Sequence, residues 1–170
     1  YIAVGTTWDA YGPLYYYDLW VVKLNSDGHI QWQKAYGGGS WDIGFAVQQT
    51  SDGGYIVAGE TWSFGSAIWV LKLDSDGDVE WQKAYGGSYS DGASTIQQTS
   101  DGGYIVAAYT KSFGPVLDIY SYAWILKLDS NGDIPDCDAI IEGDFNVTST
   151  SVEPVSTDVD VQTTSGSVVN

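Results

Sequence analysis

The sequence predicts an all-β protein built from tandem four-stranded antiparallel units, incomplete at both ends, with a β-prone C-terminal tail. Three observations support this fold class. The segment WVLKLDSDGDVEWQKAYGG at 69–87 has a near copy at 20–38 and a half copy at 124–134. These repeats are rich in Val, Ile, Tyr and Trp, the residue types that favour strands. Asp-Gly and Ser-Asp-Gly-Gly sequences separate the expected strands and supply the positive-φ positions of hairpin turns.

The strands follow from the repeat. Two stretches, 56–58 and 69–71, are apolar at every position, so we expect them to lie between two covered surfaces. The stretch 79–85 alternates Glu80 and Gln82 with apolar residues, which predicts an outer strand with one side facing solvent. Strands in the rest of the repeats are expected at 1–7, 19–24, 30–36, 45–50, 55–61 and 104–110.

The repeat has a regular period, because the equivalent residues Tyr55 and Tyr104 are 49 residues apart. A repeated four-stranded unit of roughly 40–50 residues is typical of a β-propeller blade. The segment at 69–87, together with QQTSDGGYIVAG at 48–59, resembles the repeat of secreted prokaryotic β-propellers. The resemblance extends from residue 1 to about residue 134. It implies propeller-like blades at about 1–39, 40–88 and 89–144.

The predicted blades are unfinished at both ends of the repeat region. Propellers typically have about 4–8 blades, whereas this chain holds fewer than three full ones. The first lacks the strand equivalent to 45–50. In the last, Pro135 and Asp136 stand where Glu80 and Trp81 stand in the middle one, and Pro cannot donate to a strand ladder. We therefore expect open strand edges, which are ready templates for another strand.

Residues 145–170 form a separate tail rich in Ser, Thr and Val. One interpretation is a flexible stalk that carries sugars, with Asn146 in an Asn-Val-Thr glycosylation sequon. The other is a donor strand that uses Val147, Val159 and Val161 to complete an open edge, since the residues around the last two alternate polar and apolar. Pairing with its own chain would close the body. Pairing with the next molecule would give a head-to-tail filament.

The charge of the chain restricts its partners. Six Lys, no Arg, and 22 Asp and Glu residues give a net charge of −16 at pH 7. Such a surface repels nucleic acid and anionic membranes. No apolar run approaches the roughly 20 residues that span a bilayer, so membrane insertion is not expected. Together with the resemblance, this composition favours an extracellular or cell-surface location in a prokaryote.

The sequence offers no catalytic or cofactor-binding set. His29 and Cys137 are the only histidine and the only cysteine, so a nucleophile–base pair, a zinc site and an internal disulfide are not expected. Asp74, Asp76 and Asp78 are weak calcium candidates, but their spacing fails the Gly and Glu positions of an EF-hand loop. A hairpin turn is the favoured interpretation of these carboxylates. We predict a protein that is not an enzyme and holds no cofactor.

Six tyrosines are candidates for contact with a partner subunit or a glycan, because flat rings on loops suit both. A local core within each loop is the alternative. They are expected in the two long loops and are Tyr11, Tyr15, Tyr16, Tyr17, Tyr120 and Tyr122. The repeated lysines and tryptophans are expected to be structural, with each lysine paired to a carboxylate.

These observations predict a non-enzymatic extracellular structural subunit that self-assembles head-to-tail by strand complementation, as a filament or a surface assembly. Its partner is then a second copy of the chain. The alternative is a secreted glycan-binding or adhesin module, a fragment of a larger β-propeller whose partner is a glycan.

Overall fold

The computed structural model describes residues 1–8, 16–114, 119–135 and 146–149. Within these residues the protein consists of antiparallel sheets and contains no helix, so the all-β class is confirmed. The strands are β1 (Ile2–Trp8), β2 (Tyr17–Leu24), β3 (Ile30–Tyr36), β4 (Asp42–Gln49), β5 (Tyr55–Thr61), β6 (Ala67–Leu73), β7 (Val79–Gly86), β8 (Asp91–Gln98), β9 (Tyr104–Thr110), β10 (Tyr122–Leu128) and β11 (Asn146–Ser149).

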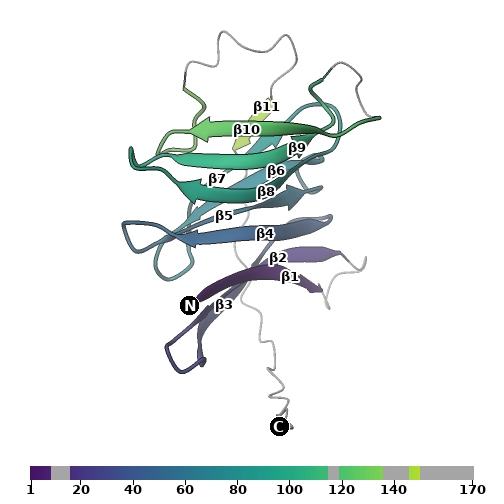
Figure 1. Ribbon diagram of the computed structural model, residues 1–170. Helices are drawn as coiled ribbons and strands as arrows, with labels where there is room; N and C mark the ends of the chain where they lie inside the picture. Colours follow the sequence, from purple (N-terminus) through teal and green to yellow (C-terminus); the bar gives the residue numbers. More distant parts are fainter. Residues whose placement is uncertain (9–15, 115–118, 136–145, 150–170) are drawn as a thin grey trace, which may run out of the picture.

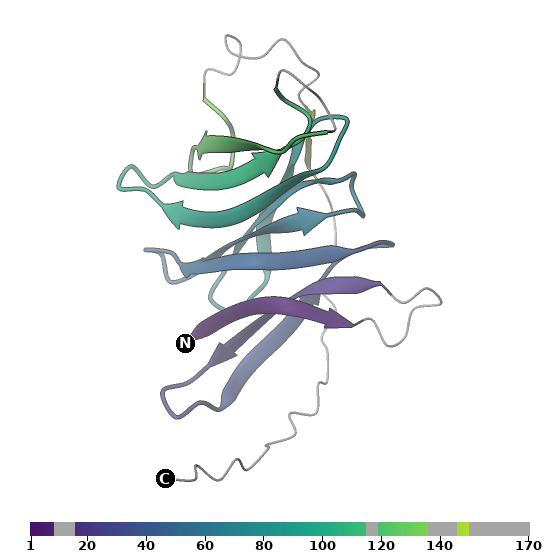
Figure 2. The same cartoon turned by 45° about the vertical axis from the view of Figure 1, so that its right-hand side comes forward.

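Three sheets follow one another along the molecule (Figure 1). The first sheet has the strand order β1-β2-β3, the second β11-β7-β6-β5-β4 and the third β10-β9-β8. The second sheet lies between the other two, and the succession from purple to green in Figures 1 and 2 traces this order. Apart from β11, each strand pairs with its neighbour in the chain, so hairpins build every sheet.

The second sheet forms the centre of the protein. Every residue of β5 and of β6 is buried, as predicted for stretches that are apolar on both faces. Ile56 and Val70 on one face belong to a core shared with the third sheet. Trp69 and Leu71 on the opposite face belong to a core shared with the first sheet. The two cores therefore hold the three sheets in a stack.

Positive-φ glycines make the tight turns that the sequence predicts. Gly53 and Gly102 have φ of 88° and 83° in the two Ser-Asp-Gly-Gly turns. Gly77 and Gly132 have φ of 80° and 78° in the turns that follow β6 and β10. Residues with a Cβ rarely adopt this conformation, so the glycines fix the hairpin register.

Two of the tyrosines expected in loops are strand residues instead. Tyr17 begins β2, because it pairs with Trp8 at the end of β1. Tyr122 begins β10, because it pairs with Thr110 at the end of β9. The hairpin ladders thus extend further toward the loops than the apolar pattern indicates.

The prediction for the outer strand β7 is half wrong. Glu80 is exposed as expected, but Gln82 is buried. The reason is a specific hydrogen bond: Nε1 of the buried Trp69 donates to Oε1 of Gln82 at 3.2 Å. A buried indole N–H requires an acceptor, and the amide supplies one inside the core.

The equivalent positions Ile56 and Ile105 give a test of the stack. Ile56 is fully buried between two sheets, whereas Ile105 lies half-buried on the third sheet. We expect Ile56→Ala to lower the free energy of unfolding by about 2–5 kcal/mol, and Ile105→Ala to lower it clearly less in dilute solution. Urea denaturation of both variants measures the difference. Equal losses would contradict the stacking order.

Candidate functional site

The same set of contacts joins each pair of neighbouring sheets. Between the first and second sheets, the Tyr36 hydroxyl donates to the Gly77 carbonyl at 2.6 Å. Trp32 packs on Gly77, where an added Cβ would come within 3.0 Å of the indole. Lys34 Nζ forms an ion pair with Asp78 Oδ1 at 2.7 Å. The outer strand β3 thus contacts the turn between β6 and β7 through a hydrogen bond, an indole contact and an ion pair.

The junction between the second and third sheets repeats this arrangement. The Tyr85 hydroxyl donates to the Gly132 carbonyl at 2.6 Å. An added Cβ on Gly132 would come within 2.7 Å of the Trp81 indole. Lys83 Nζ pairs with Asp133 Oδ1 at 2.5 Å. Burial, reinforced by the nearby aspartates, raises the pKa of both junction tyrosines, Tyr36 and Tyr85, so both keep their protons and donate.

At the two ends of the stack, equivalent residues are not covered by a neighbouring sheet. Tyr55 and Tyr104 are 1% and 2% exposed, but their first-sheet equivalent, Tyr1, is 80% exposed. Val70 is 0% exposed, but its third-sheet equivalent, Ile125, is 61% exposed. The face of the first sheet that carries Tyr1 corresponds to the one that receives a preceding sheet. The face of the third sheet that carries Ile125 corresponds to the one that receives a following sheet.

The strand patterns confirm which face of the third sheet is open. In β9, buried residues alternate with half-buried ones along the whole strand. In β10, Leu126 and Leu128 are buried, whereas Ala123 and Ile125 are exposed. One face of this sheet is therefore covered by the second sheet, and the other faces outward.

The first sheet also presents an unfilled turn. Gly28 has a φ of 83° and is the equivalent of Gly77 and Gly132. A Cβ added to Gly28 would meet no atom within 4 Å, unlike those of the other two. No described residue therefore fills the place that Trp32 and Trp81 take at the internal junctions. The exposed His29 stands in this turn where the aspartates of the ion pairs stand in the others.

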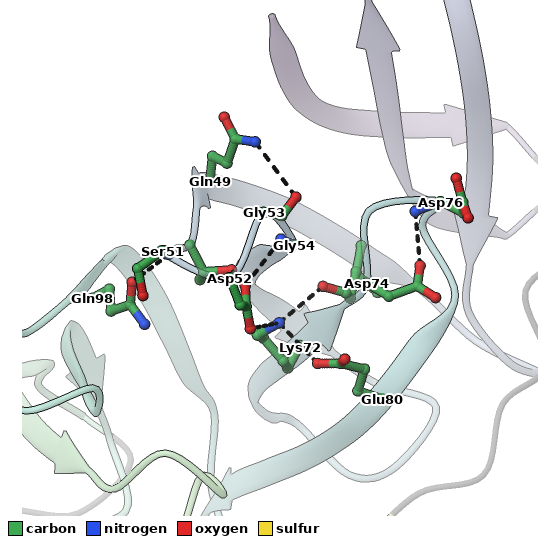
Figure 3. A network of polar contacts seen from close by, with 12 residues as sticks. Gln49, Ser51, Asp52, Gly53, Gly54, Lys72, Asp74, Asp76, Glu80 and Gln98 are labelled. Atoms are coloured by element: carbon green, nitrogen blue, oxygen red, sulfur yellow. Dashed lines mark hydrogen bonds and ion pairs between the residues drawn. The ribbon is translucent and has the colours of Figure 1, made fainter.

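A polar network closes the Ser-Asp-Gly-Gly turn of the second sheet (Figure 3). Nζ of the buried Lys72 contacts Asp52 at 2.9 Å and Glu80 at 2.8 Å, and donates to the Leu73 carbonyl at 3.2 Å. Burial alone would lower the pKa of Lys72, but its bonds to Glu80 and Asp52 outweigh burial and raise it. A hydrogen bond from Thr50, followed by the one from Lys72, lowers the pKa of Asp52 to about 2.

The third sheet keeps only part of this network. Lys127 contacts Asp101 at 2.9 Å and donates to Thr99 at 3.1 Å. Pro135 stands where Glu80 would supply the second carboxylate, and Lys127 is correspondingly more exposed than Lys72. The prediction that lysines pair with carboxylates holds for these two. Lys23 differs, because its Nζ lies 5.2 Å from the centre of the Tyr55 ring.

The three calcium candidates, Asp74, Asp76 and Asp78, have different roles in the turn between β6 and β7. Oδ1 of Asp74 accepts hydrogen bonds from the backbone N–H groups of Asp76 and Asp78 at 2.8 and 2.9 Å. Asp78 is the ion-pair partner of Lys34. Asn25 caps the equivalent turn of the first sheet in the same way with a neutral amide oxygen. Turn capping therefore accounts for Asp74 without a cation, and calcium binding stays a prediction.

The predicted contact tyrosines do not form one group. Tyr17 lies in the first sheet and Tyr122 in the third, with the second sheet between them. Tyr16 is half-buried and Tyr120 is exposed. Tyr11 and Tyr15 lie outside the described residues. Of the tail residues, Asn146 and Val147 lie in β11, whereas Val159 and Val161 lie outside the described residues.

The strand β11 pairs with the outer edge of β7 in the same chain. Its register is antiparallel and places Asn146 opposite Gly86 and Ser149 opposite Lys83. The start of the tail is therefore a strand, and its observed partner is the middle sheet. Among the described residues, no strand pairs with the outer edge of β10 or with the outer edge of β1.

A buried carboxylate between the second and third sheets was missed by sequence reasoning. Oε2 of Glu60 accepts a hydrogen bond from the Tyr109 hydroxyl at 2.9 Å, and Oε1 accepts one from Ser90 at 3.2 Å. Burial is the main cause that raises the pKa of Glu60, and Asp91 adds to it. The available signal was the departure from the repeat, since Thr6 and Tyr109 occupy the equivalent positions.

Comparison with known proteins adds no assignment, since no family model and no curated protein matches the chain. The described residues include no helix of the length and apolarity that crossing a membrane requires.

Glu60→Gln tests the buried carboxylate through its pH dependence. Because the folded pKa lies above the usual value of about 4.3, the stabilising contribution of Glu60 is complete below about pH 4.3 and is lost as pH rises through the folded pKa. Glutamine keeps both hydrogen-bonding atoms but does not ionise. We expect the variant to be more stable than the wild type at pH 7, with the gain shrinking toward pH 4. Denaturant unfolding from pH 4 to 8 measures this, and an unchanged pH profile would contradict it.

Proposed function

We propose that the protein is a non-enzymatic structural subunit that assembles head-to-tail, the open face of the third sheet of one copy docking on the open face of the first sheet of the next. The observation that supports this most strongly is the mismatch in burial between equivalent residues. Tyr1 and Ile125 are exposed where their equivalents inside the stack are covered. The two internal junctions supply a template for the covered state.

The proposed contact joins the two kinds of face that meet at each internal junction, through the inner strands, since no described strand of the third sheet corresponds to β3 or β7. The exposed face of the third sheet is equivalent to the face of the second sheet that carries Ile56 and Val70. The face of the first sheet that carries Tyr1 is equivalent to the one that carries Tyr55 and Trp69. On this face Tyr1 and Ala3 are exposed, Trp20 is half-buried and Val22 is buried. Burying one large apolar side chain such as Ile125 contributes roughly 1.5–3 kcal/mol. Since the two faces differ, the contact is heterologous and continues from copy to copy unless the rotation closes a ring.

Strand complementation is the second part of the proposal. β11 is a short segment from outside the three hairpin-built sheets, and it pairs with the edge strand β7. Exchange of this strand between copies would tie neighbours together, as in domain-swapped assemblies. Open edges on β1 and β10 favour such pairing, because unpaired N–H and C=O groups accept a further strand.

The same proposal includes the finer architecture and the location. The sheets are propeller-like blades, with the four hairpin-built strands of the second sheet as the full unit and three-stranded sheets on either side. The assembly is extracellular or on the cell surface. A net charge of −16 supports solubility there and opposes non-specific adhesion to nucleic acid.

Ile125→Asp tests face-to-face docking. A carboxylate at the centre of the proposed contact would be desolvated without a partner, so assembly should weaken by at least about tenfold in subunit concentration, the factor for ~1.4 kcal/mol. Ile119→Asp is the matched control, because Ile119 is also exposed but lies outside the strands. Sedimentation velocity across a concentration series measures both. Equal behaviour of the two variants, or a wild type that stays monomeric, would overturn the docking proposal.

Removal of residues 145–170 tests strand complementation separately. The truncated chain retains all three hairpin-built sheets, so its circular dichroism should remain that of a β protein. We expect its assemblies to be smaller than those of the full chain at the same concentration, because the exchanged strand is gone. Unchanged assembly would show that the tail does not connect subunits.

A further inference from the structure

Four aromatic rings form a continuous row across the first and second sheets. Trp8 lies 4.9 Å from Tyr17 between ring centroids, Tyr17 lies 6.2 Å from Trp41, and Trp41 lies 5.9 Å from Trp62. Each contact is edge-to-face, with interplanar angles of 89°, 72° and 79°. The row therefore uses the favoured geometry of aromatic pairs from end to end.

The row lies at one end of the strands and is held by the backbone. Trp8 ends β1 and pairs with Tyr17 at the start of β2. Trp62 follows β5, and its N–H donates to the carbonyl of Trp41, just before β4, at 2.8 Å. These strand ends lie together on the right-hand side of Figure 1. The backbone therefore holds these residues next to one another.

The indoles of the row are open to solvent although they are the largest apolar side chains. Trp8, Trp41 and Trp62 are 50%, 47% and 37% exposed. In each pair the edge of one ring meets the face of its neighbour, and the exposed fractions show that each indole still keeps uncovered surface. Such a preformed aromatic surface is typical of a binding site rather than of a core.

The fold does not require these rings. In the third sheet the equivalents of Trp62, Trp41 and Tyr17 are Lys111, Ser90 and Ser121. The backbone bond is nevertheless retained, because the Lys111 N–H donates to the Ser90 carbonyl at 3.0 Å. Trp8 and Trp62 are equivalent to each other, so the first two sheets share an indole at this position and the third has Lys111 instead. The third sheet therefore keeps this backbone contact without the indoles.

We propose that the row of Trp8, Tyr17, Trp41 and Trp62 is a binding platform for a neutral polysaccharide. Sugar C–H bonds are polarised by the neighbouring hydroxyls, so they are attracted to the negative face of an aromatic ring. Successive sugar rings of a polysaccharide can each contact an exposed indole of the row, so that several weak contacts add together.

Charge selects this ligand class over others that stack on aromatic rings. Single-stranded nucleic acid and anionic lipid require a basic groove or patch. The chain has only six lysines against 22 acidic residues, and Lys34, Lys72, Lys83 and Lys127 are in ion pairs. A neutral chain of hydroxyl-bearing rings meets no such repulsion.

The test uses affinity electrophoresis of the full chain in gels that contain hydroxyethylcellulose, laminarin, mannan or dextran, with alginate as an anionic probe. The main variant carries Trp41→Ser and Trp62→Lys, substitutions that the third sheet itself accommodates at Ser90 and Lys111. We expect the wild type to be retarded by at least one neutral polysaccharide. The double variant should lose affinity by at least about tenfold.

Two controls make the outcome specific. Tyr89→Ser removes an aromatic side chain of similar exposure outside the row and should leave retardation unchanged. Trp41→Phe keeps a ring in the row and should retain most of the affinity. Urea denaturation and sedimentation confirm that the variants share the fold and assembly state of the wild type.

The proposal is overturned if no neutral polysaccharide retards the wild type, or if the double variant binds as well as the wild type. Retardation by alginate alone, or equal loss in the Tyr89→Ser variant, overturns it as well. Because the row and the docking faces use different residues, loss of retardation with normal assembly separates this platform from the assembly proposal.

Discussion

The rest of the structure depends on one contact, in which the aromatic residues of an outer strand, β3 or β7, pack on a glycine turn of the next sheet. At both internal junctions a tyrosine hydroxyl reaches a turn carbonyl at 2.6 Å while a tryptophan covers the glycine itself. A side chain on Gly77 or Gly132 would occupy the space of the indole. Positive φ and close approach thus impose the same residue type for two separate reasons.

This contact gives the stack of sheets a direction, because it joins unlike faces of neighbouring sheets. The first and second sheets each present an outer strand, β3 or β7, to the turn of the next sheet, whereas no described strand lies beyond β10 in the third. The two ends of the stack are therefore unlike faces. The first sheet retains an unfilled turn at Gly28, and the third retains the exposed Ile125. The apolar area at the ends is therefore a consequence of the repeat itself, whatever covers it.

The sequence predicts those parts of the fold that recur. Apolar runs on both faces identified β5 and β6 as buried, and Asp-Gly signals identified the positive-φ turns. It did not predict the burial of Gln82, because the partner of that amide is an indole on the neighbouring strand rather than a residue of its own strand. Periodicity reports which face a side chain lies on, but it carries no information on a specific hydrogen-bond partner. The burial of Glu60 was not predicted for the same reason, since its two donors are Tyr109 of the third sheet and Ser90, just before β8.

Departures from the repeat show which side chains a sheet can replace while it keeps its backbone contacts. Residues that recur at 49-residue spacing satisfy the junction, and their chemistry is explained by packing and turn geometry alone. The exposed aromatics of the candidate platform and the buried Glu60 have no counterparts of the same type at the equivalent positions of the third sheet. In a repeat protein, the equivalent residue of another unit therefore shows which other side chain the same backbone position accepts. Where the third sheet keeps the backbone but replaces Trp41 and Trp62 by Ser90 and Lys111, the indoles are separable from the fold.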